Sequence, residues 1–223
     1  MKYRHEWKHE INAADMLTLR MRLNAVMKPD AHAVNGRYEI RSLYFDDGRD
    51  SALREKIDGV NEREKFRIRL YNRDDSWIML EKKSKINGLC LKQSCQISKA
   101  EAQNIVDGQV EWMKNSGRPL CQELYFKMKT KGLKPKTIVD YTREPFVFGP
   151  GNVRVTMDYN IRTGLNCVDF LNPEAVTIPA GDSCTILEVK WDEFLPDIIR
   201  DAVSLPSRQA GAFSKYAQCR IYG

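Results

Sequence analysis

The chain has 223 residues, of which 42% are hydrophobic and 30% charged, and its formal net charge is +6. This balance is typical of a globular protein with a sizeable core, and no apolar run approaches the roughly 18 residues of a membrane-spanning helix, so we expect no membrane segment. The positive charge favours an anionic partner, but charge alone does not choose among nucleic acid, phospholipid and phosphate chains.

The start of the chain and its cysteines favour a cytoplasmic protein. The first residues, MKYRHEWKHE, lack the apolar core of a secretory signal. The six cysteines contain no CxxC pair, and the three histidines have no zinc-ligand spacing with them, so we expect free thiols. No Gly/Ser/Pro-rich linker divides the chain, which predicts a single domain over residues 1–223.

The elements follow from periodicity and from breaker residues. A strand over residues 3–10 precedes a helix with Asn12 as N-cap, Asp15 in its first turn and Pro29 after its end. Further strands are predicted at residues 38–45, 62–72, 77–84, 88–95, 136–146, 152–160 and 184–191, and further helices at about 98–106, 118–131, 193–203 and 210–221. The result is an α+β domain of mostly antiparallel strands with helices outside. Eight strands is also the number at which a closed sheet leaves an interior just large enough for side chains or one ligand.

In the stretch KFRIRLYN, residues 65–72, cation and hydrophobe alternate from Lys65 to Leu70. In an extended chain, Arg67 and Arg69 therefore share one face with Lys65 and Tyr71, and the hydrophobic residues share the other. On this stretch alone, a charged face exposed to water explains the pattern equally well.

Six other strands repeat the pattern, which makes a purely solvated face less attractive. Each places charged side chains opposite a hydrophobic face. Together the charged faces hold the cations Arg4, Lys8, Arg67, Arg69, Lys83, Lys92, Arg143, Arg154 and Lys190, with Tyr141 beside Arg143, and the carboxylates Glu6, Glu81, Asp158 and Glu188.

A closed sheet with these faces inward would have a strongly cationic interior. Unpaired charges at this density are too costly to bury dry, so the interior must be wet and suited to a polyanion. Arginine and lysine bind phosphate, and a linear phosphate chain would contact many of them at once. The carboxylates then suit a hard divalent cation, Mg²⁺ or Mn²⁺, that bridges phosphate oxygens.

The chain resembles the triphosphate tunnel metalloenzymes, and within them the polyphosphate polymerase (VTC) domain. No single motif is specific, but eight occur in order from near the N-terminus to the C-terminal helix. They are RHEWK, SLYFDD, KFRIRLY, LEKK, YTREPF, VRVTMD, LEVK and AFSKY.

The resemblance implies an eight-stranded antiparallel closed barrel, the tunnel, with surrounding helices. It implies that Lys8, Arg67, Arg69, Lys83, Arg143 and Arg154 act on the reacting phosphates, and that Lys92 and Lys215 bind substrate as well, Lys215 being identified by the resemblance alone. Arg4, Lys190 and Tyr141 complete the predicted substrate-binding set from the strand pattern. Glu188 is the implied metal ligand, while Glu6, Glu81 and Asp158 are either further ligands or charge-balancing partners.

The expected activity is phosphoryl transfer from a nucleoside triphosphate to a growing polyphosphate chain. Such chemistry needs positioning and charge neutralisation more than a protein nucleophile. Hydrolysis of triphosphate in the same tunnel is the alternative, and a non-catalytic module that binds polyphosphate or inositol phosphate is a third possibility. The segment KQSCQIS after Lys92 departs from the family, which usually has another cation there, so one tunnel end is expected to bind phosphate more weakly. A nucleic-acid partner is disfavoured because no aromatic row offers a stacking platform.

Overall fold

The computed structural model describes residues 4–182, 184–205, 208 and 211–221. The elements are, in chain order, β1 (His5–Ile11), α1 (Ala13–Val26), β2 (Lys28–Pro29), β3 (Tyr38–Asp46), α2 (Ser51–Ile57), β4 (Arg63–Tyr71), β5 (Asp74–Ile86), β6 (Leu89–Ile97), α3 (Lys99–Val106), the 3-10 helix η1 (Glu111–Asn115), α4 (Pro119–Lys131), β7 (Lys134–Phe148), the 3-10 helix η2 (Pro150–Asn152), β8 (Val153–Thr163), β9 (Ile178–Pro179), β10 (Thr185–Trp191), α5 (Asp197–Val203) and α6 (Lys215–Cys219).

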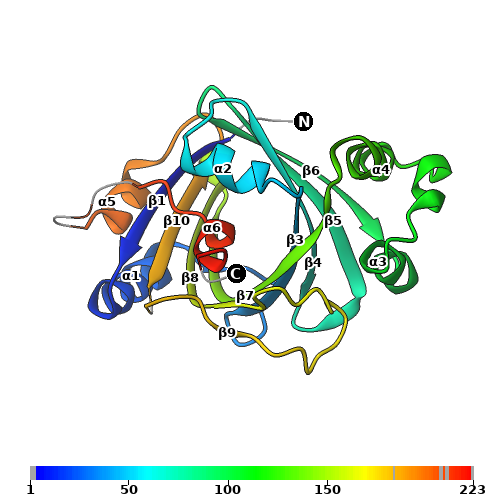
Figure 1. Cartoon of the computed structure of the whole chain (residues 1–223). Helices are drawn as coiled ribbons and strands as arrows, with labels where there is room; N and C mark the ends of the chain where they lie inside the picture. Colours follow the sequence, from blue (N-terminus) through cyan, green and yellow to red (C-terminus); the bar gives the residue numbers. More distant parts are fainter. Residues whose placement is uncertain (1–3, 183, 206–207, 209–210, 222–223) are drawn as a thin grey trace.

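The main strands form one antiparallel sheet that curls on itself (Figure 1). Their order is β1-β10-β8-β7-β3-β4-β5-β6, with the short β2 and β9 paired to β7 and β8. The α+β class and the antiparallel tunnel are thus confirmed.

Closure of the barrel is less complete than predicted. In the described residues the edge strands β1 and β6 meet at one isolated bridge, Arg4 with Cys90. Continuing this antiparallel register along β1 would pair Glu6 with Gly88, which lies in the turn between β5 and β6. A ladder cannot run through that turn, so the seam stays open beyond the bridge.

Helices cover the outer face of the sheet in two groups (Figure 1). On one side α1 and α5 pack against β8 and β10, burying Leu19, Leu23 and Ile199 completely. On the other side α3 and α4 pack against β4 and β5 around Phe66 and Ile68. The hydrophobic half of KFRIRLYN therefore faces the outer core, and the arginine half faces inward.

Local sequence signals set the ends of the covering helices. Asn12 and Ser98 each accept a hydrogen bond from the third residue of their helix, and the acidic side chain of that residue accepts one in return. Helix α4 begins at Pro119 and ends at Gly132, whose left-handed backbone (φ 68°) suits glycine. These signals explain why the predicted bounds of these helices hold closely.

A third apolar cluster lies inside one end of the barrel. Tyr38, Ile40, Tyr141 and Ile161 point inward from β3, β7 and β8, and Tyr216 of α6 packs on them. In Figure 1, which looks into the barrel, α2 and α6 lie across the opening at the end of Asp46 and Arg63, away from Tyr38. Position along the strands thus separates an apolar end from a charged middle.

Several elements differ from their predictions. Helix α2 was not predicted, and neither were the two-residue strands β2 and β9. Helix α5 begins only at Asp197, after Pro196, and α6 is limited to Lys215–Cys219. Residue 3 of the first predicted strand and residue 210 of the last predicted helix lie outside the described residues. The extent of the single domain remains a prediction.

Candidate phosphate-binding tunnel

A cavity of about 350 Å³ occupies the charged middle of the barrel. Among the described residues, eleven cations line it: Arg4, Lys8, Lys65, Arg67, Arg69, Lys83, Lys92, Arg143, Arg154, Lys190 and Lys215. Glu6 and Glu188 are the carboxylates in this lining, and Tyr141 is also part of it. The cavity therefore brings together the predicted cations of β1, β4, β5, β6, β7, β8 and β10 with Lys215 of α6.

The β4 arginines form one wall, with a buried carboxylate behind them. Arg67 donates to Glu81 Oε2 through Nε (2.7 Å) and to the Tyr44 hydroxyl through Nη1 (2.7 Å). Arg69 donates to Ser42 Oγ (3.0 Å) and to the Tyr141 hydroxyl (2.9 Å). Glu81 is only 2% exposed and also contacts Lys92. It balances the charge of this wall.

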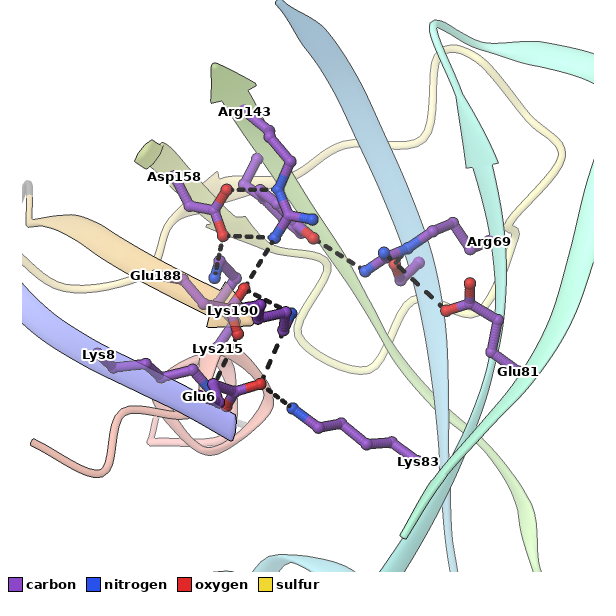
Figure 2. A network of polar contacts seen from close by, with 12 residues as sticks. Glu6, Lys8, Arg69, Glu81, Lys83, Arg143, Asp158, Glu188, Lys190 and Lys215 are labelled. Atoms are coloured by element: carbon purple, nitrogen blue, oxygen red, sulfur yellow. Dashed lines mark hydrogen bonds and ion pairs between the residues drawn. The ribbon is translucent and has the colours of Figure 1, made fainter. Parts of the chain in front are cut away.

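The opposite wall holds a second fully paired carboxylate (Figure 2). Asp158 is completely buried and accepts two hydrogen bonds from Arg143, at 2.6 Å and 2.7 Å. Lys215 lies 2.5 Å from the other side of the same carboxylate. Asp158 thus fixes the guanidinium of Arg143 and brings the C-terminal helix to the cavity.

Between the walls, lysines surround the other two carboxylates (Figure 2). Lys8 Nζ lies 2.6 Å from Glu6 and 3.4 Å from Glu188, and Lys190 Nζ lies 3.5 Å and 3.0 Å from the same two groups. Lys83 reaches Glu6 across the cavity, at 2.8 Å. Glu6 and Glu188 are neighbours on the paired strands β1 and β10, where Lys8 stands opposite Glu188.

Two arginines lie nearer solvent. Arg154 pairs with Asp30 at 2.9 Å, and its Nε is buried without a hydrogen-bond partner. Arg4 pairs with Asp192 at 2.8 Å and donates to the Asn152 carbonyl. A buried donor without an acceptor is costly, so Arg154 is suited to an incoming anion.

The carboxylates in the tunnel remain ionised at neutral pH. Burial and Glu188 act to raise the pKa of Glu6, but Lys83, Lys8 and Lys190 outweigh them and lower it to about 2. Burial also acts to raise the pKa of Asp158, but Arg143 and Lys215 outweigh it and lower this pKa to about 2. The pKa of Glu188 is well below its ordinary value, since Lys190 and Lys8 outweigh burial.

Three other groups in this cavity titrate close to neutrality. Burial, with Lys83 and Lys8 nearby, lowers the pKa of Lys65 to about 7, although Tyr44 acts against this. Burial and Lys83 also lower the pKa of Lys190 to about 8 against the effect of Glu188. Burial would raise the pKa of Tyr44, but Arg67 and Lys65 lower it to about 7. A small rise in pH above neutrality therefore removes positive charge from Lys65 and Lys190 and adds negative charge at Tyr44.

A divalent cation fits one pair of carboxylates better than the others. Glu6 and Glu188 are ionised, adjacent and exposed to the cavity, whereas Glu81 and Asp158 are enclosed by their ion pairs. Mg²⁺ is commonly bound by one or two carboxylates together with substrate phosphates, which is the donor set available here. No cluster of three or more potential metal-ligating side chains occurs among the residues that the structure describes. The four predicted metal ligands stay predictions.

Two groups in the cavity, Lys65 and Tyr44, were not among the predicted site residues. Lys65 Nζ lies 5.5 Å from the centre of the Tyr44 ring, and both side chains line the tunnel or support its wall. The signal for Lys65 was its place on the same strand face as Arg67. Tyr44 carried no separate signal, because a tyrosine on the inner face of a strand is equally expected for a residue that only packs there.

A larger cavity, of about 770 Å³, lies near the apolar end of the barrel and also touches Tyr141. Its charged groups are mostly engaged: Arg41 donates to Asp140 at 2.9 Å, and Arg162 bonds Thr177. Charge is therefore better arranged for a polyanion in the smaller cavity.

In the described part of the chain, no helix has the length and apolar character required to cross a membrane.

Comparison with solved structures supports the fold. A putative adenylyl cyclase from Hippeastrum, described as having a dominant triphosphatase activity, aligns with a TM-score of 0.59 at 11% identity over 98% of this chain and 95% of its own. A putative adenylate cyclase from Bacillus halodurans has a TM-score of 0.49 at 13% identity over 85% and 80%. Protein PH1819 from Pyrococcus horikoshii OT3 has 0.44 at 18% over 90% and 84%. At these identities the Hippeastrum structure shows a shared fold and nothing of activity.

Comparison with curated protein sequences found no match. The VTC domain model, in contrast, matches residues 3–222, nearly the entire chain. This match agrees with the eight ordered motifs and with the cationic tunnel that those motifs build. The chain belongs to the VTC domain family.

Proposed function

We propose that the protein transfers the γ-phosphoryl group of a nucleoside triphosphate to a polyphosphate chain, with Mg²⁺ or Mn²⁺ as cofactor. The observation that carries the proposal is the convergence of arginines and lysines from seven strands on one enclosed cavity. Even with Asp30 and Asp192, which pair with Arg154 and Arg4, six carboxylates are too few to neutralise these eleven cations, so a polyanion is the expected occupant. Membership of the VTC domain family supports polyphosphate as the acceptor.

The arginines position the phosphates. Arg67 and Arg143 are oriented by Glu81 and Asp158, so their guanidinium groups are held in place before substrate arrives. This preorganisation lets them stabilise the charge that develops on the transferred group without rearrangement. Arg69 and Arg154 extend the same cationic surface along the cavity.

The lysines neutralise charge on both sides of the reacting phosphate. Lys8, Lys83 and Lys190 contact Glu6 or Glu188, yet each ammonium group has three donors and can bind a phosphate oxygen while keeping its carboxylate partner. Glu6 and Glu188 would hold the metal ion, which supplies further charge neutralisation when bound. Phosphoryl transfer of this kind needs no protein nucleophile.

Hydrolysis is the second candidate. The Hippeastrum protein is described as having a dominant triphosphatase activity, and it shares this fold. In that case water, rather than the end of a phosphate chain, accepts the same phosphoryl group in the same cavity. The small number of cavity-facing carboxylates, Glu6 and Glu188, favours transfer because an extensive acidic metal site suits activation of water.

The test is incubation of the purified protein with ATP and Mn²⁺ or Mg²⁺, followed by separation of the products. Polyphosphate and ADP are expected. ADP with free phosphate alone would establish hydrolysis instead, and no turnover, with triphosphate binding intact, would establish a binding module. Arg20→Ala serves as a control for unspecific effects of removing an arginine. Arg20 pairs with Glu144 on the outer face of the sheet, so its loss should leave turnover unchanged.

A further inference from the structure

The inner face of β4, β5 and β6 carries two rows of cations beside the turn between β5 and β6. In the first row Lys65 stands opposite Lys83, which stands opposite Lys92. In the next row towards the turn, Arg63 stands opposite Lys85. Like charges directly opposite each other on a sheet repel, so two such rows destabilise the strands unless anions separate them.

Two of the three lysines in the first row have carboxylate partners, whereas among the described residues neither cation of the second row has one. Lys83 pairs with Glu6, and Lys92 pairs with Glu81. Within the described residues, Arg63, Lys85 and Lys56 of α2 form no ion pair: Arg63 donates to the Val60 carbonyl and Lys56 to the Ala212 carbonyl, at 2.9 Å. Lys56, Arg63 and Lys85 together form a cationic collar.

The collar cations repel one another across a small space. Burial lowers the pKa of Lys56, and Arg63, Lys8 and Lys85 lower it further. Glu64, the nearby acidic residue, is engaged outside by Lys82, at 2.8 Å, and by Lys127. Glu64 thus pairs with these two lysines and, among the described residues, with none of the three collar cations.

A cavity of about 350 Å³ connects the collar to the tunnel. It is lined by the collar residues and also by Glu6, Lys8, Lys65 and Lys83, which line the tunnel cavity as well. In the part of the chain that the structure describes, six cations line this cavity against two carboxylates, Glu6 and Glu64. An anion can therefore extend from the tunnel to the collar along a predominantly cationic surface.

The other end of the barrel is less suited to an anion. Along β4, Arg63 lies at one end and Tyr71 at the other, where Tyr71 packs on the inward apolar cluster of Tyr38 and Ile40. A charged chain that is too long for the tunnel cavity would have to desolvate against apolar side chains in that direction. Its favourable path runs past Lys65 to the collar.

We infer that Lys56, Arg63 and Lys85 form a subsite for the phosphates of a linear polyphosphate that extends beyond the tunnel. Every internal phosphate of such a chain carries a negative charge, so one chain separates the repelling cations of both rows. The subsite rests on the proposed function in its substrate class. It adds the direction in which the chain leaves the tunnel and the residues that hold it.

The test compares binding of tripolyphosphate with binding of a longer linear polyphosphate of defined length, by calorimetry without metal. The collar variant Lys56→Gln/Arg63→Gln/Lys85→Gln keeps the side-chain stems and removes the charges. We expect the wild type to bind the longer chain more tightly, and the variant to lose roughly tenfold or more in affinity for it. Affinity for tripolyphosphate should change by less than about threefold, because only long-range attraction is removed.

The matched control, Lys28→Gln/Lys114→Gln/Lys131→Gln, removes the same charge from exposed positions outside both cavities. It should bind both ligands as the wild type does. Equal weakening of both ligands in the collar variant, or equal affinity of the wild type for both, would overturn the subsite while leaving the proposed function intact. Failure of the wild type to bind either ligand would contradict the proposed function as well.

Discussion

At the residue scale, the tunnel arginines differ in how much they also serve the fold. Arg69 is 2% exposed and joins β3, β4 and β7 through Ser42 and Tyr141. Arg154 has an exposed side chain by comparison, and Asp30 is its ion-pair partner. The alternating pattern placed both residues on the same inner face without distinguishing these roles.

Truncation should separate the two roles. Arg154→Ala is expected to weaken triphosphate binding about tenfold to a hundredfold, from the roughly 1.5 to 3 kcal/mol of a charge-assisted hydrogen bond, with little change in melting temperature. Arg69→Ala should lose affinity and also melt at lower temperature, because Tyr141 and Glu81 lose a buried partner. Calorimetric binding and thermal melting measure the two effects. Unchanged affinity in Arg154→Ala would remove that residue from the phosphate site.

Glu188 can be tested for a metal role apart from its ion pairs. Glu188→Gln removes a negative charge but keeps the shape of the side chain beside Lys8 and Lys190. Metal-dependent turnover should be lost, whereas triphosphate binding without metal should stay or become tighter, because the site becomes more cationic. Turnover assays with Mn²⁺ and binding assays with a chelator give the comparison. Wild-type turnover in the variant would exclude Glu188 as an essential ligand.

The neutral-range groups predict proton uptake on binding. Lys65, Lys190 and Tyr44 have pKa values of about 7, 8 and 7, and an anion beside them raises all three. Binding of triphosphate at pH 8 should therefore take up protons, and affinity should fall as pH rises from 7 to 9. Calorimetry in buffers of different ionisation enthalpy measures the uptake. Lys65→Met should reduce it, and an unchanged value would exclude Lys65 as a contributor.

At the element scale, the connection between β7 and β8 depends on a glycine. Gly151 has a left-handed backbone (φ 70°), and a Cβ there would collide with the Phe194 carbonyl oxygen. The turn also receives a hydrogen bond from the Asp192 amide to the Gly151 carbonyl, at 3.1 Å. This turn thereby orders the segment after β10, next to Arg4 of the tunnel.

Gly151→Ala should destabilise the protein more than a matched glycine substitution does. Gly108→Ala is the control, because Gly108 has a similar φ of 76° with nothing within 4 Å of its added Cβ. Both variants incur about 1 to 2 kcal/mol of left-handed strain, and only Gly151→Ala adds the collision. Urea unfolding measures the difference. Equal losses in the two variants would show that the loop relaxes freely.

At the scale of the whole molecule, the barrel combines two apolar outer layers with a charged interior. The layers of α1 and α5 and of α3 and α4 supply the hydrophobic burial, so the inward faces are free to hold charge. The carboxylates inside link β1, β5, β8 and β10 to cations of other strands. Interior charge thus couples the two halves of the sheet.

This coupling predicts acid sensitivity. Glu6 and Asp158 have folded pKa values of about 2, below their ordinary 4.5 and 3.8, so the unfolded chain binds more protons between these limits. Their stabilisation is fully present above about pH 5 and is lost as pH falls towards 2. Urea unfolding across this range should show a falling free energy of unfolding, by about 1.4 kcal/mol per pH unit for each extra proton bound. A flat profile would mean that these ion pairs contribute nothing net.

The sequence by itself determined the strand faces and the family. Alternation is a local property of an extended chain, so Arg67, Arg143 and Lys190 could be placed on the inner face without knowing their neighbours. Capping residues such as Asn12 and Ser98 located their helices for the same reason. Helix α2 escaped because seven residues carry too little periodicity to stand out.

Tertiary structure alone decided which charged groups meet. Four carboxylates looked alike in sequence, yet Glu81 and Asp158 are enclosed by arginines and lysines, while Glu6 and Glu188 face the cavity. Tertiary structure alone also decided the barrel seam, where Arg4 and Cys90 form an isolated bridge in the part of the chain that the structure describes. Each of these outcomes depends on distances between strands far apart in the chain, and electrostatic partners are set by those distances rather than by any local pattern.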